Sequence, residues 1–174
     1  MRLIRLLLVL ALAAGVAGCG GQGVAAKKWA GSVCAALTPW RARIGDLTAQ
    51  AQQQLTTAKT AAQTKTNVVD LLAGAESASE TARKGVAAAG MPDVPDGAQI
   101  AAHFTDSLKK ARDAYGHAKT SVGGLSTSDA KAFYAGVKGV FDTLGTEYAA
   151  SALDTDHVGS AELQKAFNEV PECR

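Results

Sequence analysis

The chain has 174 residues, a formal net charge of +2 and a composition that is 47% hydrophobic but only 5% aromatic. Two of its basic residues lie in the first 18 positions, and the remainder has as many basic as acidic residues. This balance excludes the dominant basic surface on which nucleic-acid binding depends, so no nucleic-acid partner is expected. The richness in Ala, Lys, Gln and Thr, without β-branched or aromatic runs, favours helices over strands.

The first 18 residues are arranged like a secretory signal peptide. Arg2 and Arg5 form a positive start, an apolar run occupies residues 6–16, and Ala17 and Gly18 are the small residues that precede a cleavage site. The apolar run is shorter than the ~20 residues that a helix needs to span a bilayer. We therefore expect a processed signal rather than a transmembrane anchor.

The segment Val16-Ala17-Gly18-Cys19 resembles the lipobox of bacterial lipoproteins. The resemblance implies a signal peptide over residues 1–18, a diacylglycerol with acyl chains such as palmitate on Cys19, and a flexible tether over residues 19–26. Two acyl chains give stable anchoring, whereas one gives only marginal binding. The expected location is the outer face of the cell membrane, lipid-anchored and extracytoplasmic. A simple secretory peptide cut slightly earlier, which would leave Cys19 as an ordinary thiol, is the alternative.

The first amphipathic pattern places apolar residues at steps of three and four from Trp29 to Leu55, which predicts one buried helix face. The two tryptophans on this face are interpreted as core residues. Pro39 interrupts the pattern, so the helix either kinks there or ends, with Thr38 capping a second helix that has proline in its first turn. The polar residues 56–66 are expected to end this helix and lead to the next.

The second pattern, residues 68–89, has similar spacing but small side chains, so it buries little apolar area. Gly90 ends it. Asp96 and Gln99 have the spacing of a capping box, which predicts that a third helix begins there and continues through residues 100–122.

Ser126 and Asp129 have the same capping spacing and predict a fourth helix, with inward-facing residues between 133 and 151. After a turn, Leu163 and Phe167 mark a fifth helix. Long amphipathic helices with short connections predict an all-α fold, an antiparallel four-helix bundle formed by residues 27–174 as a single domain. Its first helix would be kinked or broken, and its C-terminal fifth helix short.

Once Cys19 is assigned to lipid, Cys34 and Cys173 remain. Disulfides persist outside the cytoplasm, so we expect these two cysteines to form one. A metal site is the weaker alternative, because two thiols without nearby Cys or His residues do not complete a tetrahedral set. No metal and no cofactor are therefore expected.

Trp29-x4-Cys34, Pro39, the segment Pro95-Asp96-Gly97 and a cysteine one residue from the C-terminus resemble the small secreted proteins and lipoproteins of actinobacteria. The similarity covers nearly all of the chain after the signal. That family has no known function. The resemblance therefore implies an exported helical domain with a disulfide, and it carries over no active site.

Four basic residues, Lys27, Lys28, Arg41 and Arg43, precede the first acid of the predicted domain, Asp46. This segment begins a few residues from the predicted lipid. Basic residues near an anionic bilayer gain ~1 kcal/mol each, so the four are candidates for a membrane-facing surface. A solvated helix face explains them equally well.

Two polar patterns resemble metal sites only in part. Residues 154–165 begin like a calcium loop, but Val158 and Lys165 stand where ligands are required, so a capped turn is the favoured interpretation. His103 and His117 lie on one polar stripe of the third helix. They would be about 21 Å apart along an ideal helix, too far to share an ion. A solvated face is the favoured interpretation.

The sequence contains no nucleophile elbow, phosphate loop or His-Glu-x-x-His motif, so an enzyme is not expected. We expect a membrane-anchored lipoprotein with a non-catalytic binding or structural role in the cell envelope, whose protein or small-molecule partner the sequence does not identify. The alternative is a carrier of a small apolar ligand. Its cavity between the helices would be lined by Trp40, Phe104, Tyr115 and Phe141.

Overall fold

The computed structural model describes residues 23–151 and 158–173. The predicted signal peptide and Cys19 lie outside these described residues, and so do residues 154–157 of the predicted turn. The helices are α1 (Ala26–Thr57), α2 (Ala61–Ala88), α3 (Gly97–Gly124), α4 (Ala130–Ala149) and α5 (Ala161–Glu169), followed by a 3-10 helix, η1 (Pro171–Cys173). The prediction of an all-α helical bundle is confirmed.

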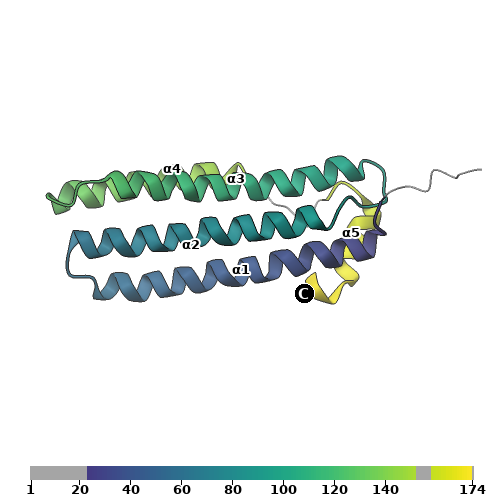
Figure 1. Cartoon of the computed structure of the whole chain (residues 1–174), viewed down its shortest axis with the longest axis horizontal. Helices are drawn as coiled ribbons and strands as arrows, with labels where there is room; N and C mark the ends of the chain where they lie inside the picture. The colour runs from purple at the N-terminus through teal and green to yellow at the C-terminus, as the bar shows by residue number, and fades with distance from the viewer. Residues whose placement is uncertain (1–22, 152–157, 174) are drawn as a thin grey trace, which may run out of the picture.

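The three longest helices, α1, α2 and α3, lie side by side and antiparallel, with α2 between the other two (Figure 1). Residues 58–60 alone join α1 to α2, which leaves room only for an antiparallel turn. α4 packs along α3 with a smaller contact to α2, while α5 and η1 pack against α1. The fourth side of the bundle is therefore shared, with α4 towards one end and α5 at the other (Figure 1).

α1 continues through Pro39 as one helix, so the alternative in which a second helix begins at Thr38 is wrong. The Thr38 hydroxyl instead donates a hydrogen bond to the carbonyl oxygen of Glu172 in η1 (2.9 Å). Leu37 and Trp40, on either side of the proline, are both buried. Burying such side chains contributes ~1.5–3 kcal/mol each, which offsets the ~3 kcal/mol that an interior proline costs.

The connection between α1 and α2 is much shorter than the predicted 56–66, because only residues 58–60 lie outside the two helices. Thr60 caps α2, since its side chain accepts a hydrogen bond from a backbone N–H in the first turn (3.2 Å). Thr64 is buried, and its hydroxyl lies 3.3 Å from the hydroxyl of Tyr134 in α4. The cap at Thr60 and the contact between Thr64 and Tyr134 thus explain why α2 begins within the polar segment that was predicted to be a connection.

The predicted capping box at Asp96 is wrong. Asp96 adopts a left-handed backbone conformation (φ 58°), and its side chain makes no capping hydrogen bond. The chain passes tightly from α2 to α3, and a Cβ on Gly97 would collide with the carbonyl oxygen of Pro92. The turn geometry therefore sets the start of α3.

In α4 the cap is Asp129 rather than Ser126, and its carboxylate accepts a hydrogen bond from a first-turn backbone N–H (3.1 Å).

The end of the bundle near α5 contains the aromatic cluster, formed by Trp29, Phe104 and Phe167. Trp29 of α1 packs edge-on against Phe104 of α3 and Phe167 of α5, with ring centroids 5.4 and 6.0 Å apart. The Trp29 indole N–H donates a hydrogen bond to the carbonyl oxygen of Gly90, just after α2 (2.9 Å). Around the cluster lie further buried residues, including Val33, Leu37, Val86, Leu108 and Leu163. Both tryptophans are core residues, as predicted.

A second core cluster lies between α2, α3 and α4. Its buried members are small or aliphatic: Val68, Leu72, Ala114, Ala118, Val122 and Leu144. Small side chains let the helices approach closely but remove less apolar area from water than the aromatic cluster does. This end of the bundle is therefore stabilised less by hydrophobic burial.

The predicted Cys34–Cys173 disulfide is confirmed, with Cα atoms 5.0 Å apart and a sequence separation of 139 residues. Cys34 lies on the buried side of α1, and Cys173 ends η1. The buried Val170 and the Thr38–Glu172 hydrogen bond hold the same segment against α1. The disulfide thus fastens the C-terminal segment to the first helix.

Replacing both cysteines, Cys34→Ser with Cys173→Ser, should lower the melting temperature, because the reduced unfolded chain regains the freedom that the cross-link removes. The chain-entropy estimate for so long a loop is on the order of 5 kcal/mol as an upper figure, or about 10–20 °C. Calorimetry measures the shift, and limited proteolysis should cut the variant first near η1. Equal melting temperatures for the two proteins would contradict the assigned role.

Candidate functional site

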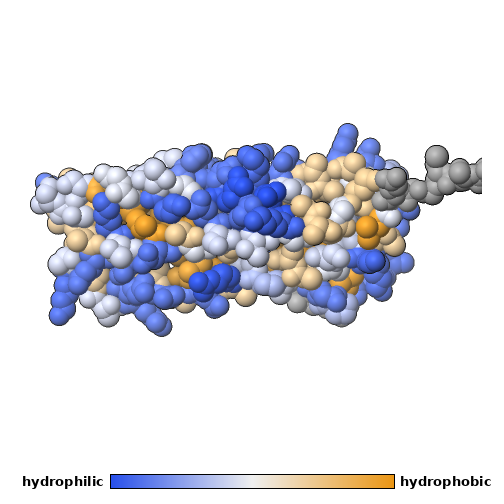
Figure 2. Space-filling view, in the orientation of Figure 1, coloured by the Kyte–Doolittle hydropathy of each residue, from blue (hydrophilic) through white to orange (hydrophobic). Residues whose placement is uncertain are grey.

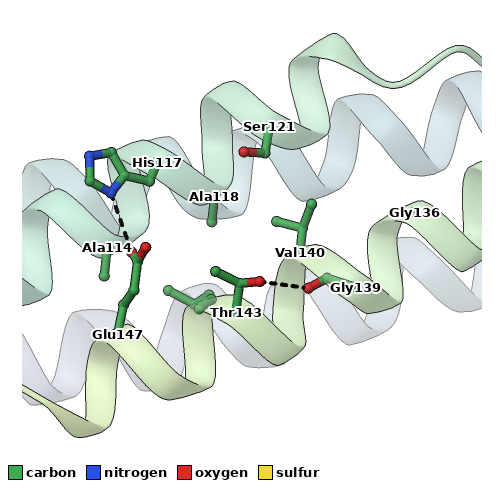
Figure 3. A pocket seen from close by; sticks show the side chains of 10 residues that line it. Ala114, His117, Ala118, Ser121, Gly136, Gly139, Val140, Thr143 and Glu147 are labelled. Atoms are coloured by element: carbon green, nitrogen blue, oxygen red, sulfur yellow. Dashed lines mark hydrogen bonds and ion pairs between the residues drawn. The ribbon is translucent and has the colours of Figure 1, made fainter.

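An open groove of about 270 Å³ lies between α3 and α4 and is called here the α3–α4 groove. Figure 3 shows the side chains that line it. It is hollow because small residues line both of its sides, Ala114 and Ala118 on α3 and Gly136 and Gly139 on α4. Val140 and Leu144 add apolar surface, and the remaining lining residues are polar: His117, Ser121, Thr143 and Glu147.

The polar groups of this groove are solvated or already bonded. His117 Nδ1 lies 3.3 Å from Glu147 Oε2, with 71% and 40% of the two side chains exposed. The Thr143 hydroxyl donates a hydrogen bond to the carbonyl oxygen of Gly139 in its own helix (3.1 Å). Proton transfer and nucleophilic catalysis require an oriented base within reach of a nucleophile or substrate. The groove thus presents an exposed His–Glu pair and a hydroxyl that is already bonded within its own helix.

A second groove, of about 340 Å³, lies between α1 and α2. Trp40 reaches its lining but is only 8% exposed. The Trp40 indole N–H donates a hydrogen bond to Ser79 Oγ (3.0 Å), and the Ser79 hydroxyl donates in turn to the carbonyl oxygen of Ala75 (2.9 Å). Since both polar groups are satisfied within the core, Trp40 is held as a packing residue. The groove has a mixed lining: Ala36, Pro39, Trp40, Arg43, Gly74, Ser77, Ala78, Thr81 and Ala82.

The four aromatic residues of the predicted ligand cavity lie in different places. Trp40 and Phe104 belong to the core around the aromatic cluster, whereas Tyr115 packs against the second cluster. Phe141 is 38% exposed on α4. Tyr115 contacts Tyr148, with ring centroids 5.7 Å apart, and partial burial together with this neighbour raises the pKa of Tyr115. The fold therefore does not bring the four residues around one space.

Charged residues of α2 and α3 form the charged cluster, made of Glu80, Arg83, Lys109, Arg112 and Asp113. Glu80 accepts hydrogen bonds from Arg83 (2.7 and 2.8 Å) and from Arg112 (2.9 Å), and Arg112 also donates to Asp113 (2.6 Å). Lys109 completes the cluster by pairing with Asp113. In Figure 2 strongly hydrophilic residues cover the middle of the face shown, over α2 and α3. Sequence spacing carries no signal for the link between the two helices, because Glu80 and Arg112 lie 32 residues apart.

Hydrogen bonds from Arg83 and Arg112 lower the pKa of Glu80 to about 2. Both arginines have their own pKa raised by the same contacts. Each of the five side chains thus has an oppositely charged partner, as in a structural ion-pair network between helices. The cluster joins α2 to α3, and its three cations and two anions give it a formal net charge of +1.

The four basic residues of α1 are exposed but do not share one face. At 3.6 residues per turn, Lys27 and Arg41 lie on one side of α1, and Lys28 and Arg43 lie towards the other. Lys27 also pairs with Glu169 of α5 (3.7 Å). Arg43 borders the groove between α1 and α2. Their arrangement is that of a solvated helix surface more than of one basic patch.

The polar stripe of the third helix is likewise divided among separate contacts. His103 is exposed, His117 pairs with Glu147, and Asp113 belongs to the charged cluster. Among residues 23–151 and 158–173, no three His, Cys, Asp or Glu side chains gather as a metal ion would require. None of the described helices has both the length and the apolar character needed to cross a bilayer.

Comparison with known proteins found no matching family model, no similar curated protein and no similar solved structure. The function therefore has to be inferred from the residues of this chain.

Replacing Glu80 by Gln should reduce stability only where the carboxylate is charged. The folded pKa of about 2 lies below the ordinary value of 4.5, so the stabilisation is complete above pH 4.5 and is lost as the pH falls towards 2. Melting curves of the wild type and Glu80→Gln should therefore differ at neutral pH and converge near pH 2. Asp106→Asn, an exposed carboxylate of α3 outside the charged cluster, serves as the control and should show no such convergence. A difference between wild type and Glu80→Gln that does not change with pH would contradict the assignment.

Proposed function

We propose that the chain is a lipid-anchored protein of the extracytoplasmic face of the membrane, with a non-catalytic binding or structural role in the cell envelope. The observation that carries the proposal is the Cys34–Cys173 disulfide, which closes nearly the whole described domain. Structural disulfides of this kind belong to oxidising compartments outside the cytoplasm. The apolar N-terminal run supplies the corresponding export signal, and Cys19, three residues after the run, supplies the site of the anchor.

The non-catalytic part of the proposal is supported by how the polar groups are used. The large pKa shifts belong to Glu80, which is held by two arginines, and to Tyr115, which packs against another tyrosine. Neither group lines the α3–α4 groove. Catalytic sites usually combine a perturbed group with a cleft. Glu80 borders an open surface hollow between α2 and α3, but its carboxylate is already held by hydrogen bonds from Arg83 and Arg112.

A carrier of a small apolar ligand is the weaker alternative. Carrier sites enclose most of the ligand surface in a largely apolar cavity. The grooves beside α4 and α1 are open and partly polar, and the aromatic residues expected to enclose a ligand lie apart. The geometry therefore favours recognition by the outer surface over storage within the bundle.

Replacing Cys19 by Ser should abolish lipid attachment, because serine lacks the thiol that forms the thioether. Mass spectrometry of the cellular protein should find a diacylated N-terminal Cys19 in the wild type and none in the variant. Detergent phase separation should move the variant from the detergent-rich to the aqueous phase.

Cys34→Ser provides the matched control, since it replaces a cysteine of the domain but leaves the lipobox intact. This variant should still carry lipid. An unmodified Cys19 in the wild type, or an N-terminus at another residue, would refute the lipid anchor and favour a simple secretory peptide.

A further inference from the structure

α4 is the most apolar helix of the bundle, yet it buries the smallest part of its length. Its buried residues are Phe133 and Leu144. Tyr134, Phe141 and Tyr148 on the same helix are 48%, 38% and 36% exposed, and they are three of the five large hydrophobic residues exposed in the described part of the chain. Exposed apolar surface concentrated on one helix marks an interaction surface more often than scattered single residues do.

The spacing of these aromatic residues matches what a second helix requires. Tyr134, Lys138, Phe141, Gly145 and Tyr148 follow one another at steps of four and three, which places them in one line along α4, called here the outer stripe. Repetition every seven residues is the pattern of a helix that packs against another helix. Phe133 and Leu144 beside this line face the bundle, so α4 has one face for its own domain and a second face that the described helices leave largely exposed.

Two aromatic residues of the outer stripe, Tyr134 and Tyr148, are held in position by contacts with other helices of the bundle. The Tyr134 hydroxyl lies 3.3 Å from that of Thr64 in α2, and the Tyr148 ring packs against Tyr115 in α3. Side chains that are already ordered lose less conformational entropy when a partner covers them. The outer stripe is thus a preorganised surface.

Gly145 interrupts the outer stripe at a position where no neighbouring group among the described residues requires glycine. A Cβ added at Gly145 would meet nothing within 4 Å. Glycine inside a helix costs ~1 kcal/mol relative to alanine. Without a side chain at this position, a neighbouring backbone can approach α4 closely.

The charges along the outer stripe discriminate between possible partners. Lys138 and Asp142 are both exposed and pair within α4 (2.7 Å). Two copies of α4 packed in parallel would place lysine beside lysine and aspartate beside aspartate. An antiparallel arrangement would place each Lys138 near Asp142 of the second copy. The adjacent opposite charges also leave this part of α4 without a net positive charge to attract an anionic lipid surface.

We propose that the outer stripe of α4 is the docking surface for a second copy of this chain, packed antiparallel with Phe141 near the two-fold axis. Tyr134 of one copy then lies against Tyr148 of the second copy, and Lys138 faces Gly145 and Asp142. This arrangement is self-complementary, as a two-fold interface requires. It depends on neither the lipid anchor nor any role in the envelope.

The self-association of the chain from Gly20 to Arg174, which contains every described helix, tests the proposal by sedimentation equilibrium over the micromolar range. The wild type should form a reversible dimer. Phe141→Lys should raise the dissociation constant roughly thirtyfold or more, as truncation of a central aromatic contact does. Leu55→Lys is the matched control, because Leu55 is also 38% exposed but lies on α1, and it should leave the dimer unchanged.

A wild type that stays monomeric, or a Phe141→Lys variant that dimerises as well as the wild type, would overturn the proposal. Binding of the monomeric wild type to phosphatidylcholine and phosphatidylglycerol vesicles, lost in Phe141→Lys, would assign the outer stripe to a lipid surface instead. Circular dichroism checks that each variant is folded.

Cysteine cross-linking tests the orientation even if Phe141→Lys proves unstable. Tyr134→Cys and Tyr148→Cys are prepared separately and mixed under mild oxidation. The antiparallel arrangement predicts a cross-link between the two variants and little within either alone, since the positions are about 21 Å apart along one helix. Self-linked products would refute the antiparallel orientation, and the absence of cross-links would refute the surface.

Discussion

Trp29 occupies the point at which most of the bundle meets. Its ring contacts Phe104 of α3 and Phe167 of α5, and its indole N–H bonds to the carbonyl oxygen of Gly90 at the end of α2. One fully buried side chain of α1 therefore contacts α3, α5 and the end of α2. The other features of this end, the disulfide and the docking of η1, depend on α5 being held by the same cluster.

This concentration of large side chains makes the bundle uneven. Around Trp29, aromatic packing, a disulfide and the Thr38–Glu172 hydrogen bond act on one region. The opposite end relies on small residues of α2 and α3 and on Leu144 of α4. Local opening costs less free energy where fewer apolar contacts are lost, so we expect α4 to exchange its amide hydrogens faster than the first half of α1. The helix that carries the outer stripe thus has fewer buried side chains to hold it than the first half of α1 has.

The two proposals together constrain how the protein would lie in an envelope. In each copy α1 begins at one end of the bundle (Figure 1), so an antiparallel dimer would place the two starts of α1 at opposite ends. Both tethers can reach one membrane only if the bundles lie along its plane. The basic residues of α1, spread around the helix, then need not form a single patch, because anchoring would come from two lipids and orientation from the dimer.

Local chemistry in the sequence was sufficient to predict several features. Apolar residues at steps of three and four located all five helices, and the count of cysteines left Cys34 and Cys173 as the pair that forms the disulfide. Both tryptophans were assigned to the core because they lie on the apolar face of their helix. These inferences succeed because helix periodicity and cysteine chemistry depend on near neighbours or on composition.

Other features were decided only when the helices packed. Pro39 is tolerated within α1 because the residues around it are buried, and Asp96 is not a cap because the tight passage from α2 to α3 places its backbone in the left-handed region. The amphipathic pattern of the fourth helix could not reveal that Tyr148, which has the spacing of an inward-facing residue, would be 36% exposed. Likewise, no spacing could join Glu80 to Arg112 across two helices. Each of these outcomes depends on which helix lies beside which, and that arrangement is set by the packing of the whole chain rather than by the pattern of any one segment.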